Sequence, residues 1–452
     1  MNVKDYGAKG DGTTDDTVAI QAAFAAVASS GVKQQVLIPP GTYRIASGLS
    51  ADLSYCSIKG HGAVIDASAL SAGSALLLTG SVSLPYYQAT SSIEGIELKG
   101  PQPASSWDPG NPNTVIGIKC HTAVSTGNGT SHSYFTNLSI HGFGTGLYLG
   151  SRHYCTQFAN SDIFACGTGV HCPPTTEVED AGERTTFHGC TFFNSALAIE
   201  IENDIGGYNF LFCSFDYNVK QLAVNTAKVW LTHCHIEAYK GNDPPNHGPT
   251  YPGTPITVSG AGGTLVCSGC WILLNGSGTP AHSYTIRCDA AAGQGGGALF
   301  TGCFFNNLGT PTGEFADPAG TGSVIVQNYF SYNQTDNPPL LSTGARYNLL
   351  ADGSFEQGIE DNIFIWQDDN NPDLASLTLG SNIQLLRSNA EARSGTWSLE
   401  VQKSGAAGTG ASFALAVPVS EGAHPSYRLY YKISAVPATT GSFERGARGR
   451  NG

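Results

Sequence analysis

A short strand-like quartet recurs seven times in the middle of the chain, and it constrains the fold more than any other feature. Each copy carries a small residue, a thiol or, once, a leucine at its second position. Successive copies lie 21 to 36 residues apart, which gives a base period near 22 residues with insertions. A period of this size, with one strand set per turn, predicts a solenoid. The copies are N-L-S-I from Asn137, N-S-D-I from Asn160, G-C-T-F from Gly189, F-C-S-F from Phe212, H-C-H-I from His233, G-C-W-I from Gly269 and G-C-F-F from Gly302.

The cysteines fit the inside of such a solenoid. Identical positions stack at about 4.8 Å per coil, and thiols are small and apolar enough to fill an inward line. All 12 cysteines lie between Cys56 and Cys303, so we expect buried thiols and no disulfide framework. Cys267 and Cys270 form one C-x-x-C, which leaves half a zinc site or a redox pair as alternatives. We expect no metal and no cofactor. Five cysteines share the inward position: Cys190, Cys213, Cys234, Cys270 and Cys303.

The charge balance narrows the choice of partners. The formal net charge is -13, and no cluster of five or more Lys and Arg residues occurs. Nucleic acids and anionic membranes are bound through positive charge, so we expect neither as a partner. The sequence has no run of about 18 apolar residues, and its start lacks the apolar core of a secretion signal. These features predict no membrane insertion.

The N-terminal segment combines a glycine-rich turn with the start of a helix. Asp15 or Asp16 is expected to cap a short helix over residues 17–27, whose apolar face would hold Val18, Ile20, Phe24 and Val27. A strand, a Pro-Gly turn and a second strand follow over residues 36–45. Capping, and not metal binding or catalysis, is the expected role of the two aspartates.

This opening resembles that of the pectate-lyase-3 superfamily. The resemblance rests on N-V-K-D-Y-G-A-K-G-D-G-T-T-D-D-T at residues 2–17 and I-P-P-G-T-Y at residues 38–43. It implies an all-β fold, a right-handed parallel β-helix with a short N-terminal capping helix. We therefore expect a cap over residues 1–45 and a single-stranded parallel β-helix over residues 46–340. Leucine-rich repeats have a similar period, but their dense L-x-x-L-x-L frame is missing.

The pattern changes after about residue 340. Largely alternating strands predict a C-terminal antiparallel β-sandwich over residues 348–452. The segment N-L-L-A-D-G-S-F-E at residues 348–356 is similar to the opening of jelly-roll carbohydrate-binding modules. Such a module could bind glycan or support trimerisation, and both uses stay open.

Two outward columns follow from the quartet by strand alternation. They bring carboxylates, a histidine and aromatic rings to one face, as a groove for sugars requires. Asp216 and Glu237 share a column on adjacent coils, and close carboxylates separate their pKa values into an acid and a base. The first column holds Ser139, Asp162, Thr191, Ser214, His235, Trp271 and Phe304; the second holds His141, Phe164, Phe193, Asp216, Glu237, Leu273 and Asn306.

Further candidates lie beside these columns. Alternation puts Glu200 and Glu202 outside, where we expect them to line the neighbouring edge of the groove. Long segments over residues 101–114, 173–184 and 241–255 are expected to form its walls. The predicted catalytic residues are Asp216, Glu237, His235, Glu202 and Asp162, and the predicted substrate-binding residues are Trp271, Trp107, Tyr239 and Glu200. The alternatives are solubilising acids, structural histidines and packed tryptophans.

The resemblance also implies a function. Members found in bacteriophage tailspikes depolymerise bacterial surface polysaccharides, so we expect a trimeric tailspike-like depolymerase that hydrolyses a capsule, O-antigen or exopolysaccharide in the virion tail. One alternative is a non-catalytic adhesion or receptor-binding protein. Another is a secreted or cell-surface bacterial uronan lyase or epimerase, for which Lys228, Lys240, Tyr239 and Arg287 offer basic and phenolic groups.

Overall fold

The chain divides into two units, residues 1–347 and residues 348–452. A computed structural model describes residues 1–80, 91–102, 108, 112–122, 129–239, 254–275, 284–290, 296–306, 314–317, 320–327 and 330–331, together with the backbone of five strands in the second unit. In these parts no helix is both long and apolar enough to span a membrane.

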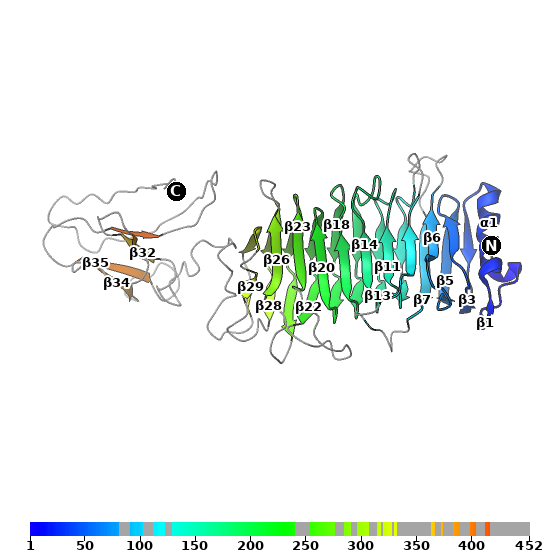
Figure 1. The fold of residues 1–452 in the computed structure, drawn as a ribbon, viewed down its shortest axis with the longest axis horizontal. Coiled ribbons are helices and arrows are strands. Elements are labelled where there is room, and N and C mark those ends of the chain that lie inside the picture. Colours follow the sequence, from blue (N-terminus) through cyan, green and yellow to red (C-terminus); the bar gives the residue numbers. More distant parts are fainter. Residues whose placement is uncertain are drawn as a thin grey trace. The chain divides into compact units, whose positions relative to one another are not determined.

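The first unit is a parallel β-helix, as predicted. Its strands hydrogen-bond in parallel to strands one coil away, in a 21-stranded and a 10-stranded sheet. Figure 1 shows the coils following one another along the axis, with α1 (Thr17–Ser30) at the N-terminal end. The first coils contain η1 (Val3–Tyr6), β1 (Asp11–Asp15), β2 (Gln34–Leu37), β3 (Gly41–Arg44), β4 (Leu49–Asp52), β5 (Cys56–Asp66), β6 (Ser74–Thr79) and β7 (Ser92–Lys99).

Beyond β7 each coil contributes three short strands, which we call the first, second and third stacks. The first stack is β9 (Tyr134–Thr136), β12 (Gln157–Ala159), β15 (Thr185–His188), β18 (Gly207–Leu211), β21 (Lys228–Thr232), β24 (Thr264–Ser268), β27 (Gly297–Thr301) and β30 (Ser323–Gln327). The second is β10 (Ser139–His141), β13 (Asp162–Phe164), β16 (Thr191–Phe193), β19 (Ser214–Asp216), β22 (His235–Tyr239), β25 (Trp271–Asn275), β28 (Phe304–Asn306) and β31 (Phe330–Ser331).

The third stack continues β4 and β6 and forms the 10-stranded sheet. The first and second stacks count as one sheet because β7 pairs with both β9 and β10. The third stack adds β8 (Ile116–Cys120), β11 (Thr145–Leu149), β14 (Thr168–Cys172), β17 (Leu197–Ile201), β20 (Lys220–Asn225), β23 (Ile256–Gly260), β26 (Tyr284–Ala290) and β29 (Glu314–Ala316).

The predicted quartet marks the corner between the first and second stacks. The first residue of all seven copies adopts the left-handed conformation, with φ between 47° and 63°. Asn and Gly accept this conformation most easily, and they occupy five of the seven corners. The second residue of every copy points inward and is no more than 2% exposed. The alignment made from sequence is therefore confirmed.

The inward cysteines form the expected line of buried thiols. Each thiol donates to a carbonyl of the first stack one coil earlier, as Cys213 does to Phe187 at 3.5 Å and Cys234 to Phe210 at 3.3 Å. All 12 cysteines are free, and Cys155 alone among them is not fully buried. Cys267 and Cys270 both lie in the core without a disulfide. Burial raises the pKa of Cys166 to about 12, which keeps this thiol protonated.

The N-terminal helix covers the first coils with the face formed by Ile20, Ala23, Phe24 and Val27. Val18 is 79% exposed, so its predicted place on this face is wrong. It stands only two residues before Ile20, and residues two apart lie on different sides of a helix. Asp15 and Asp16 both have structural roles, but they accept hydrogen bonds from different segments. Asp15 accepts from the Thr17 amide at 3.1 Å, whereas Asp16 accepts from the Lys9 and Gly10 amides.

The second unit contains antiparallel strands. One sheet joins β32 (Ile363–Trp366), β33 (Pro372–Asp373) and β36 (Ser412–Leu415), and another joins β34 (Ile383–Ser388) to β35 (Ser398–Lys403). Antiparallel pairing is what a sandwich requires, and the packing of a complete sandwich over residues 348–452 stays a prediction.

The thiol line gives a test of the packing. Cys213→Leu adds side-chain volume between Cys190 and Cys234, whereas Leu138, the one large residue in this line, has the small Ser161 on the next coil. Overpacking of this kind costs roughly 1–3 kcal/mol of unfolding free energy, measured by chemical denaturation. Cys155→Ser, at a half-buried position, is the control and should change stability by less than about 0.5 kcal/mol. Equal stability of Cys213→Leu and the unaltered chain would contradict the close packing of the inward line of thiols.

Candidate functional site

The third stack carries a row of four chemically active side chains on consecutive coils. Strand register pairs Lys119 with Tyr148, Tyr148 with His171, and His171 with Glu200. On either side of each row residue the strands bury an aliphatic or thiol residue, such as Val170 and Cys172 in β14. The row therefore points outward, and neighbouring members are held one coil apart.

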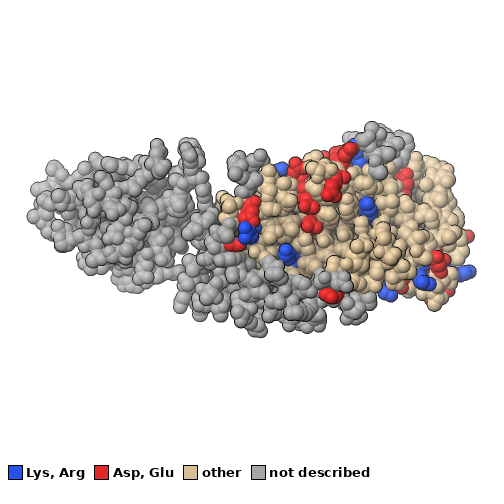
Figure 2. All heavy atoms as spheres, viewed as in Figure 1, with Lys and Arg blue, Asp and Glu red and all other residues tan. Residues whose placement is uncertain are grey.

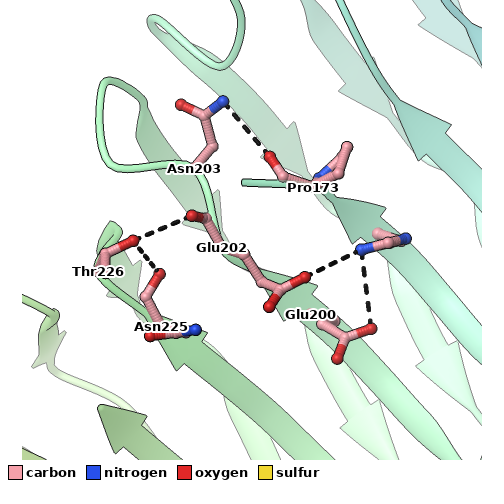
Figure 3. A network of polar contacts seen from close by, with 7 residues as sticks. Pro173, Glu200, Glu202, Asn203, Asn225 and Thr226 are labelled. Carbon is pink, nitrogen blue, oxygen red and sulfur yellow. Dashed lines mark hydrogen bonds and ion pairs between the residues drawn. The ribbon is translucent and has the colours of Figure 1, made fainter. Parts of the chain in front are cut away.

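The row is connected by direct contacts. The Lys119 ammonium lies 4.9 Å from the centre of the Tyr148 ring, and that ring meets the His171 ring edge-on at 5.5 Å. Nε2 of His171 lies 3.3 Å from Oε2 of Glu202 and 3.9 Å from Oε2 of Glu200. Figure 3 shows both carboxylates turned toward this one ring nitrogen. Two carboxyl groups and an imidazole thus converge on one small area.

The surroundings of Glu200 shift the pKa of its carboxyl group. Burial raises the pKa of Glu200 above its usual value, and the charge of Glu202 adds to the rise, while His171 and Lys220 oppose it. Burial also raises the pKa of Tyr148, with a further contribution from the charge of Glu177. A carboxyl group whose pKa is raised, beside a second carboxyl group, is the arrangement that general acid catalysis uses.

Hydrogen bonds join the turns that lie beside the row. The Asn203 amide donates to the Pro173 carbonyl at 3.5 Å, and the Thr226 hydroxyl donates to the Glu202 carbonyl at 2.9 Å (Figure 3). Thr175 donates to the Asp204 carboxylate at 2.7 Å. These bonds hold residues 173–184 against the strand ends that carry Glu202. The predicted wall over residues 173–184 therefore borders this row.

The same region is strongly acidic. Figure 2 shows Asp and Glu side chains gathered in the part of the view where Figure 1 places β14 to β20. The exposed acids of the 173–184 segment and of the turn after β17 are Glu177, Glu179, Asp180, Glu183 and Asp204. Arg152 lies among them but is paired with Glu179 and Asp180. The surface around the row is thus net negative.

The second stack holds the cluster on which the sequence prediction centred. Register pairs Ser214 with His235 and His235 with Trp271, as predicted for the first outward column. Nδ1 of His235 lies 3.0 Å from Oδ1 of Asp216, and the Ser214 hydroxyl donates to Oδ2 of Asp216 at 2.7 Å. The hydrogen bond with Asp216 raises the pKa of His235 against the opposing effect of burial, and the charge of Glu237 adds to the rise.

The remaining predicted residues are distributed unequally. Glu237 follows His235 on β22 and is only 8% exposed. Asp162 is exposed in the first column, two coils before Ser214, so it does not join Asp216. Glu200 and Glu202 lie on the third stack and its end, and not on the edge of the second-stack cluster as expected, because the coil turns a corner between the two strands. Trp107 and the side chain of Tyr239 lie outside the described residues.

Sequence reasoning missed Lys119, Tyr148 and His171. The signal was present in the strand that follows each quartet, where T-G-L-Y-L at 145–149, T-G-V-H-C at 168–172 and L-A-I-E-I at 197–201 align without gaps. Their fourth positions are Tyr148, His171 and Glu200, and Lys119 is the fourth residue of the similar strand I-G-I-K-C at 116–120. Within the described parts of the chain, no group of three or more His, Cys, Asp or Glu side chains is arranged to hold a metal ion.

Comparison with known proteins agrees with this fold. Alginate lyase 7 of Azotobacter vinelandii is 47% identical over 66 residues, which cover 15% of this chain and 8% of that protein. Mannuronan C5-epimerase AlgE6 of the same organism is 41% identical over 100 residues, which cover 20% of this chain and 11% of that protein. The chain thus spans only a small part of these relatives.

A solved structure shows the same architecture. The enzymatically active domain of tailspike protein 4 of bacteriophage CBA120 superposes with a TM-score of 0.51 at 14% identity, over 88% of this chain and 53% of that one. Residues 1–221, which include the row from Lys119 to Glu200 and the adjoining Glu202, match the family model described as rhamnogalacturonase A/epimerase, pectate lyase-like. This part of the chain is therefore similar to the pectate-lyase-like family, and the parallel β-helix that it forms agrees with that likeness.

Proposed function

We propose that the protein is a polysaccharide depolymerase that hydrolyses glycosidic bonds of a bacterial surface polysaccharide at the row on the third stack. The observation that carries the proposal is the pair Glu200 and Glu202, whose carboxylates approach the same nitrogen of His171 while the pKa of Glu200 is raised. A carboxyl pair in which one member has a raised pKa is the usual machinery of glycoside hydrolysis.

Each group has a distinct role in this reaction. Glu200, whose pKa is raised, is the proton donor to the glycosidic oxygen as the bond to the anomeric carbon breaks. Glu202 supplies the carboxylate that activates water or attacks the anomeric carbon. His171 lies between the two and orients them through Nε2. Tyr148 adds an aromatic edge and a hydroxyl one coil away, where the next sugar would bind.

The names of the relatives support a polysaccharide substrate. The matched proteins are called an alginate lyase and a mannuronan C5-epimerase, and both names refer to sugar polymers. The matched segments are a small part of those proteins, so their own substrates and reactions are not carried over. The tailspike structure supports the fold alone.

A second candidate reaction is β-elimination or epimerisation of a uronate. Its support is the contact between Lys119 and Tyr148, a cation beside a phenol, next to His171. The acids around the row oppose it, because Glu177 and Glu202 would repel the carboxylate of each uronate unit. We therefore favour hydrolysis of a neutral or amino-sugar polymer.

We further propose a homotrimeric assembly in a virion tail, as in tailspikes, with secretion to the cell surface as the alternative. A non-catalytic adhesion protein would use the same face without cleavage. The raised pKa of Glu200 beside a second carboxyl group favours an enzyme over an adhesin, since binding alone needs no proton donor.

Replacement of the proposed acid tests the site. Glu200→Gln should lower kcat on a cleaved capsular or O-antigen polysaccharide by about 10²- to 10⁴-fold, measured as reducing ends released, because the amide cannot donate the proton. The matched control is Glu94→Gln on β7, since Glu94 also pairs with a histidine, His61 at 3.1 Å, and has a similarly half-exposed side chain. An unchanged kcat for Glu200→Gln, with loss of kcat in Glu237→Gln, would place the chemistry on the second stack.

The pH profile should reflect the raised pKa of Glu200. An acid catalyst works while protonated, so kcat/KM should fall as the pH rises through this pKa, above the usual range of a glutamate. The residual activity of Glu200→Gln should lack this alkaline fall. Initial rates between pH 4 and 9 are the measurement, and an identical alkaline limb in both proteins would assign it to another group.

The product identifies the reaction. Hydrolysis yields reducing ends without unsaturation, so no ultraviolet absorbance should develop while reducing ends accumulate. A parallel rise of absorbance, from the double bond that β-elimination leaves, would favour the lyase and overturn hydrolysis. Mass spectrometry of the oligosaccharides supplies the same answer, because only hydrolysis adds a water molecule to each cut.

A further inference from the structure

We propose that the second stack and its corner with the first stack form a separate binding surface for neutral sugar units, centred on Phe212, His233, His235 and Trp271. This surface lies on other strands than the row on the third stack, and its proposed role is to hold polymer, not to cut it. The inference goes beyond the proposed function and does not depend on Glu200 or Glu202.

Large aromatic side chains are exposed on successive coils of this surface. Phe212 is 60% exposed, Trp271 49% and Phe304 53%. The His233 ring stacks on Phe212 at 5.5 Å with 13° between the planes, and the His235 ring lies 5.0 Å from Trp271. Register links His235, Trp271 and Phe304 on three consecutive coils. The rings thus form a strip along the solenoid.

The backbone at the corner is unfavourable for these residues. Phe212 has φ 54° and His233 has φ 51°, a left-handed conformation that costs a residue with a large side chain on the order of 1–2 kcal/mol. The equivalent corners at Asn137, Asn160 and Gly189 carry residues that adopt it more easily. Phe212 combines this strain with exposure of an apolar ring, and neither helps folding. Such a combination points to a binding role.

The following coil leaves room for the strip. Gly269 stands at the next corner with φ 61°, and a Cβ there would lie 2.9 Å from Cδ2 of His233. Any larger residue would push the His233 ring away from its place over the corner. Phe212, His233 and Gly269 therefore act together to present two stacked rings.

Polar groups beside the rings define the ligand. Asp216 is held by Ser214 and His235 at 2.7 and 3.0 Å and keeps a partly exposed carboxylate next to the strip. Flat rings cover the C–H faces of sugars, and carboxylates accept from their hydroxyls. The neighbouring Glu237 adds negative charge, which disfavours acidic sugars and protein surfaces rich in carboxylates. Neutral, hydroxyl-rich sugar units fit this chemistry best.

Affinity electrophoresis of the full chain tests the proposal. The gels contain dextran, galactomannan or a neutral bacterial O-antigen polysaccharide, with alginate as the acidic comparison. We expect retardation by at least one neutral polymer and not by alginate. Trp271→Ala and Phe212→Asn should each weaken this affinity at least about tenfold, as loss of an aromatic contact predicts. Asn is chosen at 212 because Asn137 and Asn160 already occupy equivalent corners.

Two controls separate this surface from the rest of the molecule. Tyr134→Ala removes a 45% exposed ring from β9 on the first stack and should leave retardation unchanged. Glu200→Gln should also bind normally. The proposal would be overturned if no neutral polymer retarded the unaltered chain. It would also be overturned if the Trp271 and Phe212 variants were retarded as strongly as the unaltered chain. Absence of cleavage by the unaltered chain, with retardation intact, would count against the third-stack site alone. Retardation lost with cleavage intact in Trp271→Ala would separate the two sites.

Discussion

Parallel backbone hydrogen bonding from coil to coil is the constraint on which every other feature depends. It fixes residue against residue, as in the pairing of Ser214 with His235 and of His171 with Glu200. A residue more than 20 positions away in the sequence therefore lies one strand spacing away in space. The inward line of thiols tolerates this repetition because each sulfur is small and donates to a carbonyl of the preceding coil. Outward positions do not pack on one another in the core, so they can differ from coil to coil and carry the charged, polar and aromatic side chains.

The part of the fold that could be predicted is the part that repeats. The quartet has a fixed inward residue, so its alignment gave the register of the second stack and the exposure of Trp271 correctly. The third stack was harder to see because most of its inward positions are ordinary aliphatic residues, and its thiols, Cys120, Cys172 and Cys288, do not recur on successive coils. Lys119, Tyr148 and His171 were missed for this reason. Glu200 and Glu202 were recognised as outward residues, but the face to which they belong depends on a corner that alternation alone does not reveal.

The two outward faces differ in how their charges are arranged. On the third stack a lysine, a phenol, an imidazole and two carboxyl groups follow one another, and burial together with like charge raises the pKa of Glu200. On the second stack the carboxylate of Asp216 is satisfied by Ser214 and His235, and the hydrogen bond raises the pKa of the histidine. A raised pKa beside a second carboxyl group suits proton transfer. This contrast is why we propose reaction on the third stack and binding on the second.

The corners between the first and second stacks limit which residues can be placed there. Every quartet must place its first residue in the left-handed region, so the corner accepts Asn or Gly at little cost and other residues only at a penalty. Phe212 and His233 bear that penalty on adjacent coils, and their stacked rings stabilise each other without being buried. A solenoid selected for stability alone would carry Asn or Gly there, as it does at residues 137, 160 and 189. The position of these two rings is therefore best explained by contact with something outside the chain, and the neighbouring Trp271 and Asp216 give that contact the character of a sugar-binding surface.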